Sequence, residues 1–371
     1  MALTQPIEDY YPVHPRFINH DILHCRHKAM PGDHLYSGRA LAITTHYDVV
    51  QLHPQLQDEF PAICAHYDRV GLGYSNQIIW NLDFAERQNY ANYEASYFYF
   101  GKTPHRVARN ENWFAVVGYI NSNSNFMTLA GQLGMRVPKI WTLEHAGQID
   151  KATLAQVSYP CLLKAASRVP GIWACRCEDA AQLKQALAYF GPHTPLQIQP
   201  IVNVAARLNL QYQVVGARLE RLAACEQLQD GGGGGSRFPT PHHAWHCVEP
   251  MATWLFSQGM RGNFAFDVAV VKDNCGAEYL PVACQPHYTD AAYPALIARK
   301  LAIPHWQTRS YDTRYRRLAE LPLRELEFNA ATQSGVVLVN WGPVLVGKLQ
   351  FLIAGTPAQQ QALCAELERR L

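Results

Sequence analysis

Four short segments of the sequence carry residue types that could do chemistry. The segment YPCLLK ends in Lys164, Asp267 lies alone in the apolar segment FAFDVAVV, and Gln285 and His287 follow in ACQPH. Burying a charge is costly unless it is paired, so Lys164 indicates an anion nearby and Asp267 indicates a cation or a buried partner. Lys164 could instead lay its aliphatic stem on apolar surface and hold its ammonium group in water.

The fourth segment, PTPHHAWHC, contains His242, His243, His246 and Cys247. Two histidines three or four residues apart share a face when they lie on a helix, which is one way to bind zinc. No acidic residue stands in this segment before Glu249. We therefore favour a mixed surface helix beginning near His242 and keep a zinc site as the alternative.

The elements that must position these residues are weakly marked in the first third of the chain. Residues 1–40 predict an irregular arm over a first domain. The β-branched and apolar run at 40–50 predicts a buried strand, and a second strand is expected at 70–72. Residues 77–82 and 93–100 are further elements whose type the pattern leaves open.

The periodicity is clearer after residue 121. The segment SNFMTLAGQLG predicts a helix over 123–133 that ends at Gly134. The order strand, loop, strand, helix, strand that follows is typical of a small α+β domain. We expect strands at 137–141, 159–164, 172–176, 195–202 and 208–215, and a helix at 178–189.

Five consecutive glycines at 231–235 have no side chains to pack, so they predict a flexible surface loop. An engineered linker is the alternative, whereas a phosphate-binding loop needs glycines at defined offsets before a helix. Residues 264–271 and 278–284 predict a hairpin around the turn DNCG. The rest of the chain predicts a helix at 291–300, strands at 335–339 and 345–353, and a helix at 357–371.

Composition limits the classes of function. A chain of 371 residues corresponds to about two to three domains. It is 48% hydrophobic and only 17% charged, against a usual charged share of about 25%, so it can build more than one core. The 32 basic and 30 acidic residues give a net charge of +2. This balance argues against nucleic acid or an anionic membrane as partner and favours a small molecule.

The cysteines and the first residues bear on the compartment. The ten cysteines are scattered, and the spacing of Cys175 and Cys177 fits neither a zinc knuckle nor a redox pair, so we expect buried reduced thiols. Cys284 is the one candidate nucleophile, and it would need a histidine close in space. Glu8 and Asp9 stand where a signal peptide carries cations, and no run of 18 apolar residues occurs, so we expect a cytoplasmic protein.

Three patterns occur in an order that resembles the ATP-grasp superfamily of carboxylate–amine ligases. They are the helix ending in LGMRVP, the strand ending in Lys164, and the hairpin that carries Asp267 and is followed by QPH. The resemblance covers residues 115–300. It implies an α/β (α+β) fold in which two α+β subdomains enclose a nucleotide behind an N-terminal α/β domain. The implied divisions are an N-terminal domain at 1–120, a small lid subdomain at 121–200 and a large C-terminal subdomain at 201–371.

The resemblance also implies roles for individual residues. Lys164 aligns with the lysine that contacts the α-phosphate and adenine, and Asn123 aligns with the family's other lysine. A hinge segment would bind adenine through its backbone, although its proline lacks a donor and its glutamine replaces the family's glutamate. That hinge consists of Gln199, Pro200, Ile201 and Val202.

The metal-binding and catalytic positions depart from the family pattern. Asp267 takes the place of the first magnesium ligand. The second ligand segment, Glu-x-Asn-Pro-Arg in the family, reads Ala283 to His287 here, so Gln285 could offer only an amide oxygen. His287 replaces a permanently charged arginine. Arg168, in an altered phosphate loop, could supply some of the missing charge.

Two functions remain open on this basis. The first is an ATP-dependent ligase with ATP and Mg²⁺ as cofactors, which joins an amino acid or a small natural-product acid to an amine through an acyl phosphate. The second is a degenerate ATP-grasp protein that binds a ligand or a partner chain without ATP turnover. Fold alone serves both functions equally. The aromatic residues of the first domain are compatible with a homodimer.

Overall fold

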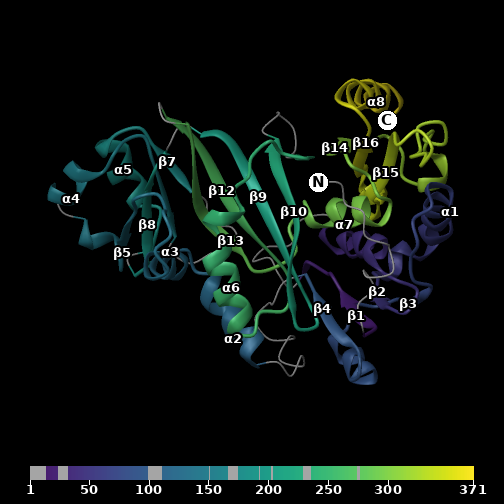
Figure 1. The fold of residues 1–371 in the computed structure, drawn as a ribbon, viewed down its shortest axis with the longest axis horizontal. Helices are drawn as coiled ribbons and strands as arrows, with labels where there is room; N and C mark the ends of the chain where they lie inside the picture. The colour runs from purple at the N-terminus through teal and green to yellow at the C-terminus, as the bar shows by residue number, and fades with distance from the viewer. Residues whose placement is uncertain are drawn as a thin grey trace.

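The chain folds around three β-sheets that lie along the long axis of the molecule (Figure 1). None of the helices in the described part of the chain combines the length and the apolar character needed to cross a membrane. The computed structural model describes residues 14–23, 32–98, 111–149, 151–165, 174–191, 193–201, 204–228, 235–273 and 276–371.

The N-terminal part contains a parallel four-stranded sheet in the order β3-β2-β1-β4. Helix α1 (Phe60–Val70) connects β2 to β3 and ends at Gly71, which adopts a left-handed φ of 76°. The parallel pairing and the connecting helix make this part an α/β unit. Its strands are β1 (Arg16–Asn19), β2 (Val49–Gln51), β3 (Gln77–Ile79) and β4 (Glu94–Tyr97).

Two expected strands in this part are wrong. The run at 40–50 was expected to be one strand, but η3 (Asp33–Ile43) is a 3₁₀ helix and β2 begins only at Val49. Polar residues of η3 such as Asp33, Ser37 and Arg39 are buried together with its apolar ones, so they do not mark a solvent-facing side with a helical period. The strand expected at 70–72 is the end of α1 and the turn that follows it.

The second sheet belongs to a small unit at the left of Figure 1, together with α4 (Lys151–Gln156) and α5 (Ala180–Leu187). We call this unit the lid, after the subdomain that the resemblance implies. Asp179 caps α5 by accepting hydrogen bonds from the backbone of Ala181 and Gln182. Leu163, Leu183 and Ile198 belong to a hydrophobic core whose buried members all lie between residues 143 and 198. The strand order β5-β8-β6-β7 joins β5 (Trp141–Leu143), β8 (Leu196–Pro200), β6 (Cys161–Ala165) and β7 (Cys175–Cys177).

The third sheet has eight strands in the order β13-β12-β9-β10-β11-β14-β16-β15. Leu210 and Phe266 on one face of the sheet pack in a core with α2 (Glu111–Ile120), α3 (Asn123–Gln132) and α6 (Glu249–Ser257). The strands are β9 (Val204–Val215), β10 (Arg218–Leu228), β11 (Gly235–Phe238), β12 (Gly262–Asp273), β13 (Gly276–Gln285), β14 (Trp306–Asp312), β15 (Gly335–Asn340) and β16 (Lys348–Ala354).

The N-terminal part shares its core with the C-terminal end of the chain. Ile18, Tyr67 and Trp341 are fully buried members of one cluster that includes β15, β16, α7 (Ala292–Lys300) and α8 (Pro357–Arg370). A Cβ atom on Gly342, the first residue of η10 (Gly342–Val346), would overlap the carbonyl oxygen of Leu35 in η3. Glycine is therefore what lets the two segments approach so closely.

The expected elements after residue 121 agree well with the structure. The helix at 123–133, the hairpin, both late helices and the strands at 159–164, 195–202 and 208–215 are confirmed within a few residues. The strand expected at 137–141 begins only at Trp141, and the helix expected near His242 begins only at Glu249. Residues 231–234 of the glycine run lie outside the described residues.

Candidate functional site

The face of the large sheet opposite α6 carries a carboxylate surrounded by amides. Oδ1 of Asp267 accepts hydrogen bonds from Asn209 Nδ2 at 3.0 Å and from Gln227 Nε2 at 3.2 Å. Its Oδ2 accepts a hydrogen bond from Gln285 Nε2 at 2.7 Å. Thr289 Oγ1 in turn donates to Asn209 Oδ1 at 3.1 Å. A half-buried carboxylate is thus stabilised by neutral donors on three strands of the sheet, β9, β10 and β13.

Strand register explains why these side chains meet. Asp267 on β12 lies opposite Asn209 on β9 and opposite Ala283 on β13. Side chains alternate between the two faces of a strand, so Asn209 and Gln211 point away from Leu208 and Leu210, which pack in the core. The expected pair of Asp267 and Gln285 is therefore brought together.

The donor set around Asp267 is compatible with a magnesium ion that is held mainly by a nucleotide. Mg²⁺ is often bound by one or two carboxylates together with substrate phosphates. Asp267 can provide the carboxylate, and Gln285 can provide an amide oxygen once its side-chain amide turns over. The described residues contain no cluster of three or more His, Cys, Asp or Glu that could hold a metal ion.

Lys164 and the hinge segment lie on adjacent strands of the lid sheet. Lys164 Nζ on β6 donates a hydrogen bond to Gln199 Oε1 on β8 at 2.8 Å. The backbone N–H of Ile201 donates to the carbonyl of Pro160 at 2.7 Å, so this donor is already used within the lid. The structure thus brings together Lys164, Gln199, Pro200 and Ile201.

The remaining expected site residues are placed less closely or lie outside the described residues. Asn123 is the first residue of α3 and is buried, with 8% of its surface exposed. Arg168 and Val202 lie outside the described residues. His287 follows β13, and its Nδ1 donates to the carbonyl of Tyr288 at 2.7 Å.

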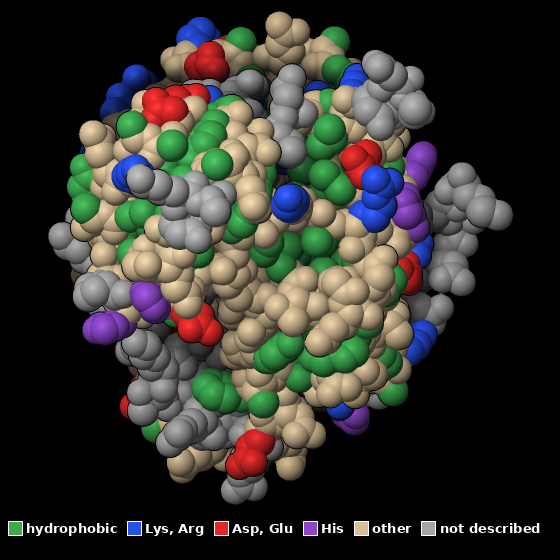
Figure 2. Space-filling model, turned by 90° about the vertical axis from the view of Figure 1, so that its left-hand side faces the viewer, with side chains coloured by type: hydrophobic (Ala, Val, Ile, Leu, Met, Phe, Trp, Pro, Cys, Tyr) green, Lys and Arg blue, Asp and Glu red, His purple; other side chains and the backbone are tan. Residues whose placement is uncertain are grey.

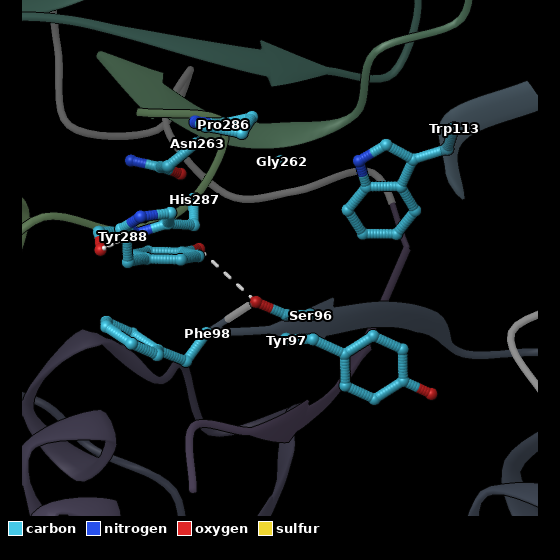
Figure 3. Close-up of a pocket in the computed structure, with 9 residues that line it drawn as sticks. All are labelled: Ser96, Tyr97, Phe98, Trp113, Gly262, Asn263, Pro286, His287 and Tyr288. Atoms are coloured by element: carbon cyan, nitrogen blue, oxygen red, sulfur yellow. Dashed lines mark hydrogen bonds between the residues drawn. The ribbon is translucent and has the colours of Figure 1, made fainter. Parts of the chain in front are cut away.

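His287 lines a small pocket between the N-terminal part and the large sheet (Figure 3). The space that the pocket encloses is about 10 Å³, close to what a single water molecule needs. The rings of Phe98 and His287 lie 5.4 Å apart between their centroids. The lining residues are Ser96, Tyr97, Phe98, Trp113, Gly262, Asn263, Pro286, His287 and Tyr288.

A chain of buried hydrogen-bonding groups begins at this pocket. The Ser96 hydroxyl lies 3.2 Å from the Tyr288 hydroxyl, as the dashed line in Figure 3 shows, and 3.1 Å from His20 Nε2. His20 Nδ1 lies 2.9 Å from the Tyr293 hydroxyl. Burial, and then the positive charges of Arg39 and Arg16, hold the pKa of His20 well below its usual 6.5, so its imidazole is neutral at pH 7.

The other sequence candidates do not gather into a site. His242 and His246 both face the ring of Tyr279, with centroids 5.9 and 5.8 Å away. Cys284 is buried, with 2% of its surface exposed. On the face of the molecule shown in Figure 2, Lys and Arg side chains lie apart or in small groups rather than in one basic patch. These observations leave the amide cluster, the lid and the pocket as the places where chemistry could occur.

Sequence reasoning missed several residues of these places. Asn209 belongs to the alternating segment LNLQYQ, and this alternation could have placed its amide on the same face as Asp267. Gln227 lies on β10, which no pattern had singled out. His20 and Ser96 are separated by 76 residues, and only the fold brings them together.

No protein-family model and no curated protein matches the chain. Solved structures do match it over nearly its whole length. The N5-carboxyaminoimidazole synthase of Aspergillus clavatus, solved with ADP and 5-aminoimidazole ribonucleotide, has a TM-score of 0.60 at 10% identity, covering 96% of this chain and 98% of that chain. The corresponding synthetase of Thermus thermophilus has a TM-score of 0.57 at 14% identity, covering 96% and 98%.

A ligase with a different substrate also matches. The L-amino acid ligase of Bacillus licheniformis has a TM-score of 0.55 at 10% identity, covering 97% of this chain and 98% of that chain. At such low identity the likeness establishes the fold and not the activity. The protein therefore shares the fold of these solved structures over nearly its whole length, which is the ATP-grasp fold that the sequence resemblance implied.

Proposed function

We propose that this protein is an ATP-dependent ligase that joins a small carboxylic acid to an amine through an acyl phosphate. The observation that carries the proposal is the match over 96–97% of the chain to ligases, one of them solved with ADP and a small substrate. Lys164 on lid strand β6 and Asp267 on the large sheet support the same proposal, because a lysine and a carboxylate are residue types that can bind phosphate and a metal ion.

The proposed reaction has two steps. A substrate carboxylate oxygen attacks the γ-phosphorus of ATP, which forms an acyl phosphate and releases ADP. An amine then attacks the acyl carbon, so that a C–N bond forms, the C–O bond to phosphate breaks and a proton is lost. Phosphoryl transfer depends mainly on positioning and on spreading negative charge over cations.

This chain's own residues take defined parts in that scheme. Lys164 places an ammonium group against the nucleotide phosphates, while Gln199 holds that ammonium group in place from β8. The carbonyl of Ile201 remains as an acceptor for a nucleotide base, because its N–H is engaged with Pro160. Asp267 and Gln285 would hold Mg²⁺, which would neutralise phosphate charge when bound. Arg168 would add charge from the loop after β6.

The test is nucleotide binding followed by turnover. ATP with Mg²⁺ is expected to raise the melting temperature, because a ligand that binds only the folded state stabilises it. Lys164→Ala is expected to abolish this rise. Lys184→Ala, on the lid helix α5, is the matched control and is expected to retain it. Candidate acids and amines should then trigger release of ADP and phosphate. A wild-type protein that shows no shift at millimolar ATP would exclude the ligase.

A second candidate function is a degenerate ATP-grasp protein that binds a ligand or a partner chain without turnover. One observation favours it: Asp267 already accepts three hydrogen bonds from amides, where a metal site would gather further carboxylates. Replacing Ala283 by Glu together with Gln285→Asn tests this alternative. A gain of ATP turnover in that double variant would identify the metal ligands as the missing element.

A further inference from the structure

The pocket beside His287 offers a ligand no carboxylate and no permanently charged cation. Its nine lining residues include no Asp, Glu, Lys or Arg. The amide of Asn263 is the lining group that bears most directly on a ligand. Asn263 is 4% exposed, and both its Nδ2 and its Oδ1 lack a hydrogen-bond partner. A buried amide without partners is costly, so this side chain indicates a ligand group that both accepts and donates a hydrogen bond.

The enclosed space limits what that group can be. A space of about 10 Å³ admits a terminal group the size of a water molecule rather than a whole ring. An ammonium group would enter without a carboxylate to pair with, and the positive charges of Arg16 and Arg39 act on the adjacent His20. An uncharged amino group satisfies all three conditions, because it is small, neutral, and both donor and acceptor.

The hydrogen-bond chain supplies an acceptor for a proton at the same place. Ser96 lines the pocket and lies within hydrogen-bond distance of His20 Nε2. A neutral His20 can carry its hydrogen on Nδ1 and donate it to the Tyr293 hydroxyl. In this tautomer, the lone pair of Nε2 faces the Ser96 hydroxyl. A hydroxyl beside an imidazole that a third group orients is the arrangement used to move protons at reacting centres.

We propose that this pocket receives the uncharged amino group of a primary amine substrate, held by Asn263, and that His20 takes the proton which that group loses, through the Ser96 hydroxyl. The proposal rests on the ligase function proposed above and names its second substrate by chemical class.

The proton transfers balance as follows. The amine nitrogen bonds to the acyl carbon and becomes positively charged, which makes its proton acidic. That proton passes to Ser96 Oγ as the Ser96 proton passes to His20 Nε2, and the C–O bond to phosphate breaks. The imidazolium then returns its proton to the departing phosphate or to water. Because the adduct is acidic, a weak base is sufficient.

The surroundings of His20 keep its charged form short-lived. Arg39 and Arg16 oppose a positive charge on it, although Arg16 is itself paired with Asp48 at 2.7 Å. Tyr288 and Tyr293 flank the ring, and burial raises the pKa of Tyr288, so this hydroxyl stays protonated. The acidic side chain of Asp290 lies 3.1 Å from Arg39 and is largely exposed.

The experiment compares two nucleophiles with one set of variants. The common amino acids are supplied as both acid and amine, and hydroxylamine is added separately because it traps an acyl phosphate without help from the protein. His20→Gln is expected to lower kcat for amide formation about 100-fold or more. Hydroxamate formation should change by less than about twofold. The low-pH limb of the kcat profile should disappear in the variant.

Further variants separate binding from proton transfer and guard against misfolding. Asn263→Leu should raise KM for the amine and leave KM for ATP unchanged. Tyr293→Phe leaves the ring packing in place and removes the partner of His20 Nδ1, so it should shift the low-pH limb of the kcat profile that His20→Gln abolishes. His34→Gln, in η3 outside the pocket, is the matched control and should behave as wild type.

Three outcomes decide the matter. Loss of amide formation with hydroxamate retained supports the proposal. Equal loss of both products, or no loss of either, overturns it while leaving the ligase intact. A wild-type protein that forms neither amide nor hydroxamate from any acid overturns the ligase function and this proposal with it.

Discussion

At the scale of single residues, the bonding of Asp267 separates a ligand-binding role from a structural one. Its two oxygens accept hydrogen bonds from three amides, so the carboxylate is satisfied before any ligand arrives. A hydrogen bond to a charged group contributes about 1.5–3 kcal/mol, so these bonds also stabilise the junction of four strands. A cation would have to compete with them for the same oxygens.

Asp267→Asn keeps the shape of this side chain and removes its charge. We expect a loss of about 1–3 kcal/mol in the free energy of unfolding, because one amide donor then faces another donor. We also expect Mg²⁺ to stop enhancing ATP binding in this variant. Urea unfolding and calorimetric titration of ATP with and without Mg²⁺ measure the two effects. Asp312→Asn, at an exposed position on β14, is the control. An unchanged Mg²⁺ effect in Asp267→Asn would remove this residue from the metal site.

Glu327 provides a test of how pH acts on stability. Burial raises its pKa, but hydrogen bonds from Arg69 and His66 outweigh burial and lower the pKa from 4.5 to about 2. A carboxylate with a lowered folded pKa stabilises the fold above its unfolded pKa and loses that contribution as pH falls. Glu327→Gln should therefore cost about 2 kcal/mol at pH 7, and the difference from wild type should shrink between pH 4.5 and about 2.

Glu366 is the control for this prediction. Hydrogen bonds from Arg369 and Arg370 also lower its pKa to about 2, but it lies on the exposed side of α8, where water screens the charges. Glu366→Gln should leave unfolding by urea at pH 7 nearly unchanged. Equal effects of the two substitutions would show that exposure does not decide the contribution of these ion pairs.

At the scale of elements, the sequence predicted best where a strand or helix has one polar side. Helix α3 and strands β9 and β12 show their periods plainly, and the capping glycine at Gly134 marks where the helical segment ends. Helix α1 was missed and η3 was taken for a strand, because burial on most sides leaves η3 no polar face to read. The pairing of Asp267 with Gln285 was expected only from the family resemblance.

The rest of the site depends on contacts between distant segments. Gln227 reaches Asp267 across 40 residues, and Tyr293 reaches His20 across 273. No local pattern encodes such pairs, because they follow from strand order and from how the N-terminal part packs against α7. The order β13-β12-β9-β10 is what places four amide or carboxylate residues on one face.

Helix α2 offers a prediction at this scale. A Cβ atom on Gly118, in the interior of α2, would have no other atom within 4 Å. Gly118→Ala should therefore stabilise the protein by up to about 1 kcal/mol, since alanine favours a helix and restricts the unfolded chain. A rise in the urea midpoint tests this expectation. A fall would mean that α2 needs the freedom of glycine at this turn.

At the scale of the whole molecule, the N-terminal and C-terminal parts form one body because they share a core. Gly342→Ala should disrupt that body, since its Cβ would overlap the backbone of Leu35 and backbone cannot move aside easily. We expect the free energy of unfolding to fall by at least about 2 kcal/mol, whereas Gly118→Ala should raise it slightly. Urea unfolding of this variant, followed by circular dichroism and compared with wild type, checks the prediction. A stability equal to that of wild type would mean that η3 and η10 can separate without cost.

The lid differs from that body because its core is its own. Leu163, Leu183 and Ile198 pack with one another inside residues 143–198, so the lid can tilt without breaking the shared core. Amide protons of β6 and β8 should exchange earlier than those of β15 and β16. ATP should slow the exchange of β6 and β8 if Lys164 closes on the nucleotide. Uniform exchange across the three sheets would contradict an independent lid.

The amides around Asp267 also bear on how this sheet could change over generations. Asn209 differs from an aspartate, and Gln227 and Gln285 differ from glutamates, only by an amide in place of the carboxylate. In the genetic code, each of these exchanges needs only one base substitution. A carboxylate-rich metal centre therefore lies a few point mutations from the present sequence, without any change in packing. Spontaneous deamidation would move an ageing molecule in the same direction.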